Sequence, residues 1–312
     1  MSNEKNVIMI DTVGIWIDKK ECQIDGKIWH FVNLTKEWKT GLKASSGNIE
    51  SLYFEYSDKG IKFYGSIAKQ NKGTNLESIS LKNTINEIDK ISSLINLDIM
   101  KYGKLTRIDI NRNISTNRDV ADYLPYLGEK ERYTRLEESK NSILYKTRYK
   151  VLSFYDKKAE MQEKHNHHLL PTLLRYELRF INQINKQLGT PSNRVKDILT
   201  KDVYFKMIDI WLEEFKTIRK NREIHINMNQ INTPKQAEER IFAELLRMQG
   251  DSFIKNILSD IKAGGNLIPQ RRYELKKRLQ KLLEKNYNDE YSLMNELETK
   301  IKEEASKAKG MV

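Results

Sequence analysis

The chain has 312 residues, of which 38% are hydrophobic and 31% are charged, enough for one large domain or for one domain with a smaller module. No apolar run approaches the roughly 18 to 20 residues of a membrane-spanning helix, and the start MSNEKN lacks the order of a signal peptide. Cys22 is the only cysteine, which excludes a disulfide framework or a thiolate metal site within one chain. These features predict a cytoplasmic protein without a membrane partner.

The net charge of +12, with 55 Lys and Arg residues against 43 Asp and Glu residues, favours a polyanionic partner. Nucleic acid is the commonest polyanion in cytoplasm, and its phosphates attract Lys and Arg side chains. Charge indicates affinity but no chemistry, so an ordinary basic surface remains an alternative at this point.

Residues 6–182 consist mostly of short alternating runs that are typical of strands. We predict strands in NVIMIDTVGIWI, LTRIDINRN, NSILYKTRYKVLSFYDKK and LLRYELRFIN. The run SLYFEYSDKGIKFYGSIA predicts a hairpin with its turn at Asp58, Lys59 and Gly60.

Helical spacing interrupts these strands and dominates after Val195. A helix is predicted over 83–96 with Asn83 as its cap, and TNRDVADYLPYL predicts a second helix capped by Thr116. We predict an α+β domain, an antiparallel sheet with flanking helices, over residues 1–230, since most of these runs are strands and two of them form a hairpin.

Residues 231–312 have a helical pattern only, and we predict a separate all-helical module there. Thr233, followed by Pro234 and then Gln236, resembles a capping box. The run ILSDIKAGGNLIPQRRYELKKRL predicts a helix, a short turn and a basic helix, which is a possible helix-turn-helix for a DNA groove. In that interpretation phosphates would be contacted by Arg271, Arg272, Lys276 and Lys277. The alternative is a helix pair with a solvated basic face.

Strand periodicity places three polar side chains on one face of the predicted sheet. Alternate residues of a strand point to opposite faces of the sheet. In LLRYELRF the Glu177 side chain therefore points to one face and its apolar neighbours point to the other. The same alternation separates Asp109 from the isoleucines of LTRIDINRN, and Tyr155 from Leu152 and Phe154. If the three strands are neighbours, these side chains share one polar face.

Two carboxylates and a tyrosine on one face suit phosphoryl transfer. Asp109 and Glu177 offer hard oxygen ligands for Mg²⁺ or Mn²⁺, which can neutralise charge on an attacked phosphate. A tyrosine with a free pKa near ~10 needs a nearby cation to become a nucleophile, and Lys157 and Lys158 follow Tyr155 directly.

Arginines in the same strands suit phosphate binding. Arg175 and Arg179 can bind phosphates through two donors each, and we also expect DNA contacts from Arg107 and Lys69. The alternative interpretation is a set of cross-strand ion pairs without catalytic function, with Tyr155 as an ordinary strand aromatic.

Three ordered motifs resemble those of rolling-circle replication initiators. They are RIDINRN with Asp109, SFYDKKAE with Tyr155, and LLRYELRF with Glu177. The closest resemblance is to the filamentous-phage gene II/X replication proteins, which also occur on phage-like plasmids. Initiators of staphylococcal rolling-circle plasmids are similar at the same three motifs.

An earlier segment extends this resemblance. GSIAKQNKGTN matches the S-x-x-K-x-x-x-G-x-N spacing of the phage family through Ser66, Lys69, Gly73 and Asn75. MIDTVGI, from Met9, resembles the usual opening of that family. The resemblance covers roughly residues 7 to 215 and makes residues 1–230 a nicking and joining domain.

The resemblance implies a function and the roles of the site residues. Tyr155 would attack one phosphodiester at a double-strand origin with Mg²⁺ or Mn²⁺ on Asp109 and Glu177, and would leave a 5′-phosphotyrosyl bond and a 3′-hydroxyl. Tyr149, which has the same strand parity, is the alternative nucleophile. The expected partners are double-stranded origin DNA, single-stranded DNA, a host helicase and a host DNA polymerase in bacterial cytoplasm, with a homodimer as an open alternative.

The sequence does not identify all ligands of the expected metal site. Many rolling-circle nucleases bind metal through a His-hydrophobic-His pair, which this sequence lacks. Asp156 and Glu160 are near enough in the sequence to be considered as a third ligand, although Asp156 has the wrong parity. The histidines of EKHNHHLLP and His225 are expected to be loop or structural residues. A non-catalytic origin-binding or copy-control protein and a metal-dependent DNA hydrolase without a covalent intermediate remain alternatives.

Overall fold

The computed structural model describes most of the chain in two compact units. The described residues are 9–22, 33–35, 44–49, 51–73, 76, 79–165, 171–221, 233–264, 268–284 and 292–310. The first unit consists of Met1–Lys220 with Leu297–Val312, and the second consists of Asn221–Glu296. None of the helices in the described ranges is long and apolar enough to cross a membrane.

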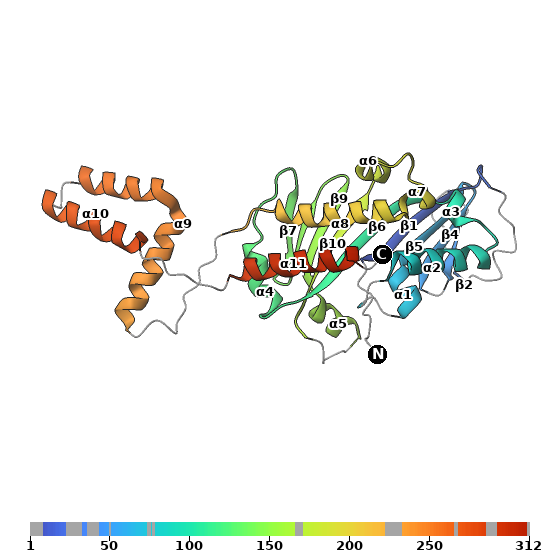
Figure 1. Cartoon of the computed structure of the whole chain (residues 1–312), viewed down its shortest axis with the longest axis horizontal. Coiled ribbons are helices and arrows are strands. Elements are labelled where there is room, and N and C mark those ends of the chain that lie inside the picture. Colours follow the sequence, from blue (N-terminus) through green and yellow to red (C-terminus); the bar gives the residue numbers. More distant parts are fainter. Residues whose placement is uncertain are drawn as a thin grey trace. The chain divides into compact units, whose positions relative to one another are not determined.

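The first unit is built on one antiparallel sheet (Figure 1). Over the described ranges its order is β2-β3-β4-β5-β1-β6-β10-β9-β8-β7. The strands are β1 (Ile10–Asp18), β2 (Asn33–Thr35), β3 (Ala44–Ile49), β4 (Leu52–Ser57), β5 (Gly60–Ser66), β6 (Lys104–Ser115), β7 (Thr134–Ser139), β8 (Ser142–Lys146), β9 (Lys150–Asp156) and β10 (Leu173–Ile181). The long strands β1, β6 and β10 lie in the middle.

Helices complete the α+β fold that the sequence predicts. In the first unit they are α1 (Ile67–Lys72), α2 (Leu81–Leu94), α3 (Ile99–Tyr102), α4 (Val120–Tyr123), the 3₁₀ helix η2 (Leu124–Tyr126), α5 (Lys157–His165), α6 (Ile184–Leu188), α7 (Val195–Ile198), α8 (Lys201–Lys216) and α11 (Leu293–Gly310). Figure 1 shows α8 and α11 lying across the strands.

An aromatic core fixes α8 against the apolar face of the sheet. The Phe154 ring stacks on Tyr176 at 4.3 Å, and Tyr176 stacks on Trp211 of α8 at 4.6 Å. Stacked aromatic pairs contribute about 0.5 to 1.5 kcal/mol beyond the apolar area that they bury. Because Phe154 and Tyr176 alternate with polar residues, packing this face against α8 leaves the opposite face of β9 and β10 polar.

The predicted strands are confirmed, and the structure adds three more. β10 lies within its predicted run, β1 and β6 extend one or two residues beyond theirs, and β4 and β5 form the predicted hairpin. NSILYKTRYKVLSFYDKK forms two paired strands, β8 and β9, instead of one. The short strands β2, β3 and β7 are not among the predicted strands, because their residues lack a clear alternation of polar and apolar side chains.

Both predicted helix caps in the first unit are wrong by three residues. Ser80, not Asn83, caps α2, because its hydroxyl accepts a hydrogen bond from the Asn83 backbone N–H at 2.7 Å. The N-cap of α4 is Asp119, while the Thr116 hydroxyl donates to the carbonyl of Arg118 at 2.9 Å. Side chains that can cap occur at both positions in each segment, so composition alone does not distinguish them.

The last helix, α11, belongs to the first unit, although the sequence places it in the module 231–312. Its apolar stripe is buried, and Leu297 and Ile301 have no exposed surface. Arg112 of β6 pairs with Glu304 of α11, and Lys300 donates to the carbonyl of Ser115 at 2.8 Å. The sequence does not predict this contact, because an amphipathic helix does not specify which surface it covers.

Acid should weaken the attachment of α11 through Glu304. Burial alone would raise the pKa of Glu304, but Lys307 and Arg112 hold it below the ordinary value of 4.5. The unfolded chain therefore binds the proton more readily, and stability is lost as the pH falls below about 4.5. We expect wild type to lose more stability than Glu304→Gln between neutral pH and about pH 3, by at most about 2 kcal/mol. Urea unfolding at both pH values measures this difference, and equal losses would contradict it.

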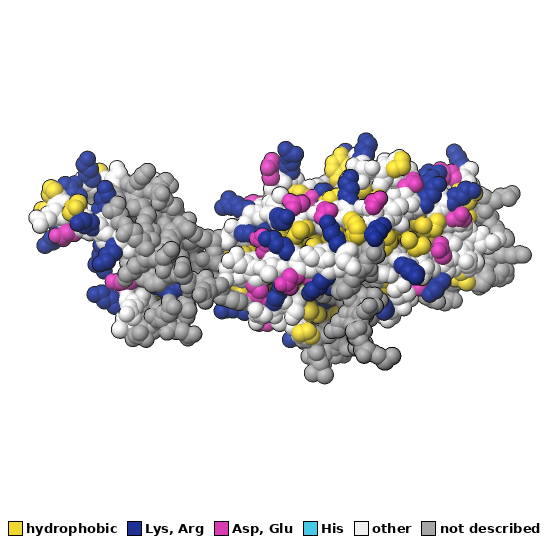
Figure 2. Space-filling model, viewed as in Figure 1, with side chains coloured by type: hydrophobic (Ala, Val, Ile, Leu, Met, Phe, Trp, Pro, Cys, Tyr) yellow, Lys and Arg dark blue, Asp and Glu magenta, His cyan; other side chains and the backbone are white. Residues whose placement is uncertain are grey.

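The second unit contains two paired helices, α9 (Pro234–Ala263) and α10 (Pro269–Glu284). The predicted capping box is confirmed, because Thr233 and Gln236 each accept a hydrogen bond from the backbone N–H of the other. α9 passes through Gly250 without interruption and continues as one helix to Ala263. Figure 2 shows Lys and Arg side chains on the visible faces of both units, with Asp and Glu between them.

Candidate active site on the polar face of the sheet

The strands β6, β10 and β9 bring the three predicted site residues onto one face. Arg179 of β10 is paired with Asp109 of β6, and two residues along the strand Glu177 is paired with Ser153 of β9. Tyr155 is paired with Arg175 at the next position of the same parity. Asp109, Glu177 and Tyr155 therefore follow a diagonal across three neighbouring strands, as the alternation predicts.

The two carboxylates lie in an ion-pair network with arginines. Arg107 donates from Nε to Asp109 Oδ1 at 2.7 Å, and its Nη2 also contacts Asp109 Oδ2. Arg179 Nε donates to Glu177 Oε1 at 2.5 Å. Longer contacts of 4.0 Å join Arg107 to Glu177 and Arg179 to Asp109. The cross-strand ion pairs of the alternative interpretation are thus present around the same carboxylates.

Burial and neighbouring charge give the two carboxyl groups different proton affinities. Burial raises the pKa of Asp109, and the negative charge of Glu177 adds to this effect while Arg107 opposes it. Burial would raise the pKa of Glu177 too, but Arg179, Arg175 and Arg107 together hold it below its ordinary value. Glu177 is therefore the carboxylate that stays ionised, and Asp109 takes up a proton more easily.

Tyr155 is half-buried, and Arg175 is the cation that acts on it most strongly. Burial raises the pKa of Tyr155 well above its ordinary value, and the charge of Arg175 opposes this rise. Lys157, expected to favour the phenolate, has no exposed surface and pairs with Glu160 at 2.6 Å. Arg175 is thus the cation beside Tyr155 in the structure, while the charge of Lys157 is compensated by Glu160.

Arg175 is itself buried, which corrects its expected position. Only 1% of its side chain is exposed, so it does not lie on an open surface for DNA. Its Nη2 donates to Asp11 Oδ2 at 2.5 Å, and its Nε lies 3.7 Å from Glu177 Oε2. Arg175 therefore links Asp11, Glu177 and Tyr155 beneath the surface of the site.

Asp11 is the site residue that sequence reasoning missed. A bulge between Ile10 and Val13 of β1 shifts the register against β6 and places Asp11 beside Asn111. Its carboxylate accepts hydrogen bonds from Arg175, from Asn111 Nδ2 at 3.1 Å and from the Ser66 hydroxyl. One acidic residue in the apolar run MIDTVGI was the available signal, because a buried carboxylate requires polar partners.

Removing Asp11 should destabilise the first unit strongly. Asp11→Ala leaves the buried charge of Arg175 without its closest carboxylate, which costs about 3 to 5 kcal/mol. Asp11→Asn keeps an acceptor and should cost less. Urea unfolding of both variants measures the effect, with Asp89→Ala on the exposed side of α2 as the matched control. An Asp11→Ala loss no larger than the control's would contradict the buried pair.

A pocket of about 410 Å³ opens beside Tyr155. It is lined mainly by polar residues of β7, β8, β9 and the start of α5, and Arg179 of β10 reaches it. Asp156 lies at its edge and caps α5, where its Oδ1 accepts from the Ala159 backbone N–H at 3.0 Å. Glu160 also lines the pocket but pairs with Lys157. The pocket offers room for a phosphodiester next to the Tyr155 side chain.

The remaining predicted residues of the first unit lie at the rim of the site or outside it. Lys158 is half-buried on α5, and Lys69 is exposed in the first turn of α1, which Ser66 caps. Tyr149 is 37% exposed in the turn before β9, where the Arg148 guanidinium lies 5.9 Å from its ring. Six residues of extended chain, roughly 20 Å, separate Tyr149 from Tyr155.

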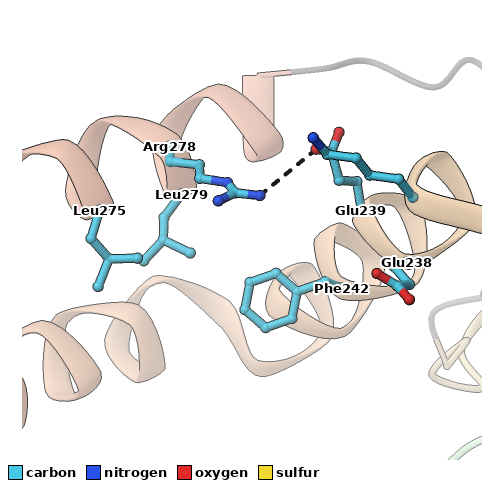
Figure 3. A pocket seen from close by; sticks show the side chains of 7 residues that line it. Glu238, Glu239, Phe242, Leu275, Arg278 and Leu279 are labelled. Atoms are coloured by element: carbon cyan, nitrogen blue, oxygen red, sulfur yellow. Dashed lines mark ion pairs between the residues drawn. The ribbon is translucent and has the colours of Figure 1, made fainter.

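The basic residues of the second unit lie on α10. Arg271, Lys276 and Lys277 are exposed and Arg272 is half-buried. A separate groove has a volume of about 580 Å³, and Arg278 pairs there with Glu239 at 3.8 Å. Figure 3 shows Phe242 of α9 pointing toward Leu279 of α10 in this groove. The groove is lined by apolar and charged side chains, whereas Arg271, Lys276 and Lys277 lie outside it and are exposed.

The site fits a magnesium ion through its two carboxylates. Within the described ranges no group of three or more His, Cys, Asp or Glu side chains is arranged to hold a metal. Mg²⁺, however, usually binds through one or two carboxylates together with waters and substrate phosphates, and Asp109 and Glu177 share the Arg107 contact. The side chains of His165, His167, His168 and His225 and the residue Asn75 lie outside the described part.

The part of the chain that contains these site residues matches a known protein family. The model of the Phage_CRI family, described as the N-terminal region of a replication-associated protein, matches residues 9–201. A solved rolling-circle replication initiator protein from Geobacillus stearothermophilus is 12% identical, with a TM-score of 0.43 over 71% of this chain and 89% of that chain. A comparison with curated proteins finds no match.

Proposed function

The chain belongs to the Phage_CRI family of replication-associated proteins, and we propose that it starts rolling-circle replication by nicking one strand of a double-strand origin through Tyr155. The family match confirms the resemblance to the filamentous-phage gene II/X replication proteins. The observation that carries the proposal is the placement of Tyr155, Glu177 and Asp109 on one face, beside a pocket and above a buried arginine.

The proposed reaction is a transesterification. The Tyr155 hydroxyl oxygen attacks the phosphorus of one phosphodiester, the bond from phosphorus to the 3′-oxygen breaks, and a 5′-phosphotyrosyl bond forms. The tyrosine loses its proton, and the leaving 3′-oxygen takes one up. Arg175 supports the reaction because its positive charge lowers the pKa of Tyr155 against the effect of burial. The phosphotyrosyl bond conserves the energy of the cleaved linkage, so the strand can be rejoined without ATP.

Asp109 and Glu177 would hold Mg²⁺ or Mn²⁺, which supplies charge neutralisation at the attacked phosphate. Arg179 lines the pocket with 30% of its side chain exposed, and it would orient that phosphate through two donors. Arg107 and Arg179 neutralise both carboxylates in the unbound protein, so binding of a metal would have to weaken these ion pairs. Lys69, exposed at the start of α1, remains a proposed DNA contact.

One incubation tests this proposal against its two alternatives. The protein is mixed with supercoiled plasmid carrying its origin and with Mg²⁺ or Mn²⁺, and the products are separated under denaturing conditions. We expect a protein–DNA adduct that resists the denaturant. Nicking without an adduct would instead indicate a metal-dependent hydrolase, and binding without nicking would indicate an origin-binding or copy-control protein.

The partners follow from the reaction. The free 3′-hydroxyl would prime a host DNA polymerase, while a host helicase separates the strands in bacterial cytoplasm. We also propose contacts with both the duplex origin and the released single strand. A homodimer would supply a second Tyr155 for the rejoining step, and Tyr149 is the alternative within one chain.

The second unit is proposed to contact DNA phosphates through α10. Replacing Lys276 and Lys277 with Gln should reduce the slope of log Kd against log salt concentration by roughly 0.9 for each phosphate that is no longer bound. Fluorescence anisotropy with labelled origin duplex over a range of salt concentrations measures the slope. The matched control replaces the exposed Lys82 and Lys90 of α2. Equal slopes for both double variants would contradict DNA binding by α10.

A further inference from the structure

A row of exposed and half-buried aromatic and cationic side chains crosses the polar face of the sheet next to the carboxylates. Tyr53 of β4 is paired with Tyr64 of β5, and Tyr64 is paired with Gly14 of β1. Gly14 is paired with Arg107 of β6, which lies two residues from Asp109. We call Tyr53, Tyr64, Arg107 and Tyr149 the aromatic row.

The row continues on the other side of Arg107. Arg107 is paired with Ile181 at the end of β10, and the Ile181 backbone N–H donates to the carbonyl of Tyr149 at 2.8 Å. Tyr149 directly precedes β9, and this backbone hydrogen bond extends the β9–β10 pairing to it, so the alternation counted from Tyr155 would place its side chain on the same face. Six strands at about 4.8 Å spacing make the row roughly 24 Å long.

Gly14 allows Arg107 to contact Tyr64 across β1. It provides no side chain between Arg107 and Tyr64, and the Arg107 guanidinium extends across β1 to the tyrosine. Arg107 Nη1 donates to the Tyr64 hydroxyl at 2.5 Å, and the guanidinium carbon lies 5.3 Å from the ring centroid. A Cβ at Gly14 would lie 2.8 Å from Thr106 Oγ1 and 3.2 Å from Arg107 Cβ, so a larger residue would disturb this contact.

The exposure of these rings is not explained by packing. Tyr64 is 36% exposed and Tyr149 is 37% exposed, whereas Phe63, the neighbour of Tyr64 on the apolar face, is 2% exposed. Large aromatic side chains placed in the open on a polar sheet face are available to contact flat apolar ligands. The Arg107 and Arg148 cations beside two of the rings would attract a negatively charged ligand.

We propose that the aromatic row binds unpaired DNA next to the nicked phosphodiester, with bases stacked on Tyr64 and Tyr149 and phosphates near the arginines. This proposal rests on the proposed function, because it assumes that the chain acts on DNA. Exposed rings with interspersed cations fit a single strand because unpaired bases offer free faces, whereas duplex bases are stacked on each other. Arg107 joins the row to the active site, since the same guanidinium binds Asp109 and Tyr64.

The test measures binding without cleavage. Each row variant is made in a Tyr155→Phe background, and its affinity for a fluorescent oligothymidylate of about 15 nucleotides is measured by anisotropy. Tyr64→Ala should weaken binding about 5- to 100-fold, and Tyr149→Ala should weaken it within the same range. Tyr64→Phe keeps the ring and should bind within about 3-fold of the parent. The slope against salt concentration should stay unchanged, because no charge is removed.

Controls separate stacking from loss of structure. Tyr102→Ala removes a half-buried tyrosine of α3 outside the row and should leave oligothymidylate binding unchanged. Circular dichroism checks folding, and Tyr149→Ala decides the question if Tyr64→Ala does not fold. Unchanged binding by the folded row variants, or an equal loss in Tyr102→Ala, would overturn the proposal.

The two proposals fail in different ways. If wild type forms a covalent adduct and the row variants bind oligothymidylate normally, the nicking function stands and the aromatic row is wrong. If wild type forms no adduct but Tyr64→Ala weakens binding as expected, the aromatic row stands and the nicking function is wrong.

Discussion

Tyr155→Phe is expected to abolish nicking and adduct formation, with a loss of activity of at least about a thousandfold. Phe keeps the ring that fills the space beside Arg175 but removes the oxygen that would attack phosphorus. The variant has little reason to unfold, because Tyr155 is half-buried and a ring of the same shape remains in its place. Conversion of supercoiled origin plasmid to the nicked form, followed over time on gels, measures the effect.

The matched control for this variant is Tyr149→Phe. Tyr149 shares the strand parity of Tyr155 but lies at the other end of β9, in an exposed turn. Its hydroxyl is expected to be dispensable for the first nick, so Tyr149→Phe should nick like wild type. If Tyr149→Phe lost activity while Tyr155→Phe kept it, the alternative nucleophile would be the correct one.

The second large effect is expected from the two carboxylates. Asp109→Asn and Glu177→Gln should each reduce cleavage at least about a hundredfold, because each removes one of the two negative charges that would hold Mg²⁺. DNA binding should persist, since neither change removes a cation. Initial nicking rates over a series of Mg²⁺ concentrations, together with anisotropy for binding, separate the two effects.

A second readout connects these carboxylates to metal without using activity. A metal that binds only the folded protein raises its stability, so Mg²⁺ should increase the melting temperature of wild type and not that of Asp109→Asn or Glu177→Gln. Glu137→Gln is the matched control, because Glu137 is an exposed carboxylate of β7 paired with Arg135. A Mg²⁺-induced shift that survives in both carboxylate variants would place the metal elsewhere.

Strict alternation explains why the centre of the site could be predicted from the sequence. The strands β6, β9 and β10 keep a period of two through the relevant residues, so the faces of Asp109, Tyr155 and Glu177 followed from counting. Whether these side chains are neighbours depends on the order of the strands, which the structure gives and which alternation alone does not determine.

Asp11 and Arg175 could not be placed in this way. The bulge in β1 changes the face of Asp11 relative to a regular strand, and a bulge in this run has no clear sequence signal. By alternation Arg175 lies on the polar face, where an exposed side chain is expected. It is buried because Asp11 of β1, two strands away in the sheet, compensates its charge. Both features depend on contacts between distant parts of the chain.

The cationic side chains near Tyr155 show the same limit. Lys157 follows the tyrosine by two residues, and closeness in sequence made it a natural partner for a phenolate. β9 ends at Asp156 and α5 starts at Lys157, so the chain changes direction and Lys157 pairs with Glu160 one helical turn later. Arg175 reaches Tyr155 instead because it is its cross-strand partner.

Identifying the residue to which the DNA is covalently bound is the most direct test of the central claim. The adduct is formed on origin plasmid, the DNA is trimmed with nuclease, and the protein is digested with trypsin for mass spectrometry. Cleavage after Lys150 and Lys157 gives the peptide VLSFYDK, in which Tyr155 is the only tyrosine, whereas Tyr149 leaves in the separate dipeptide YK. We predict that the nucleotide phosphate is found on VLSFYDK. Its presence on YK or on any other tyrosine peptide would contradict the proposed nucleophile.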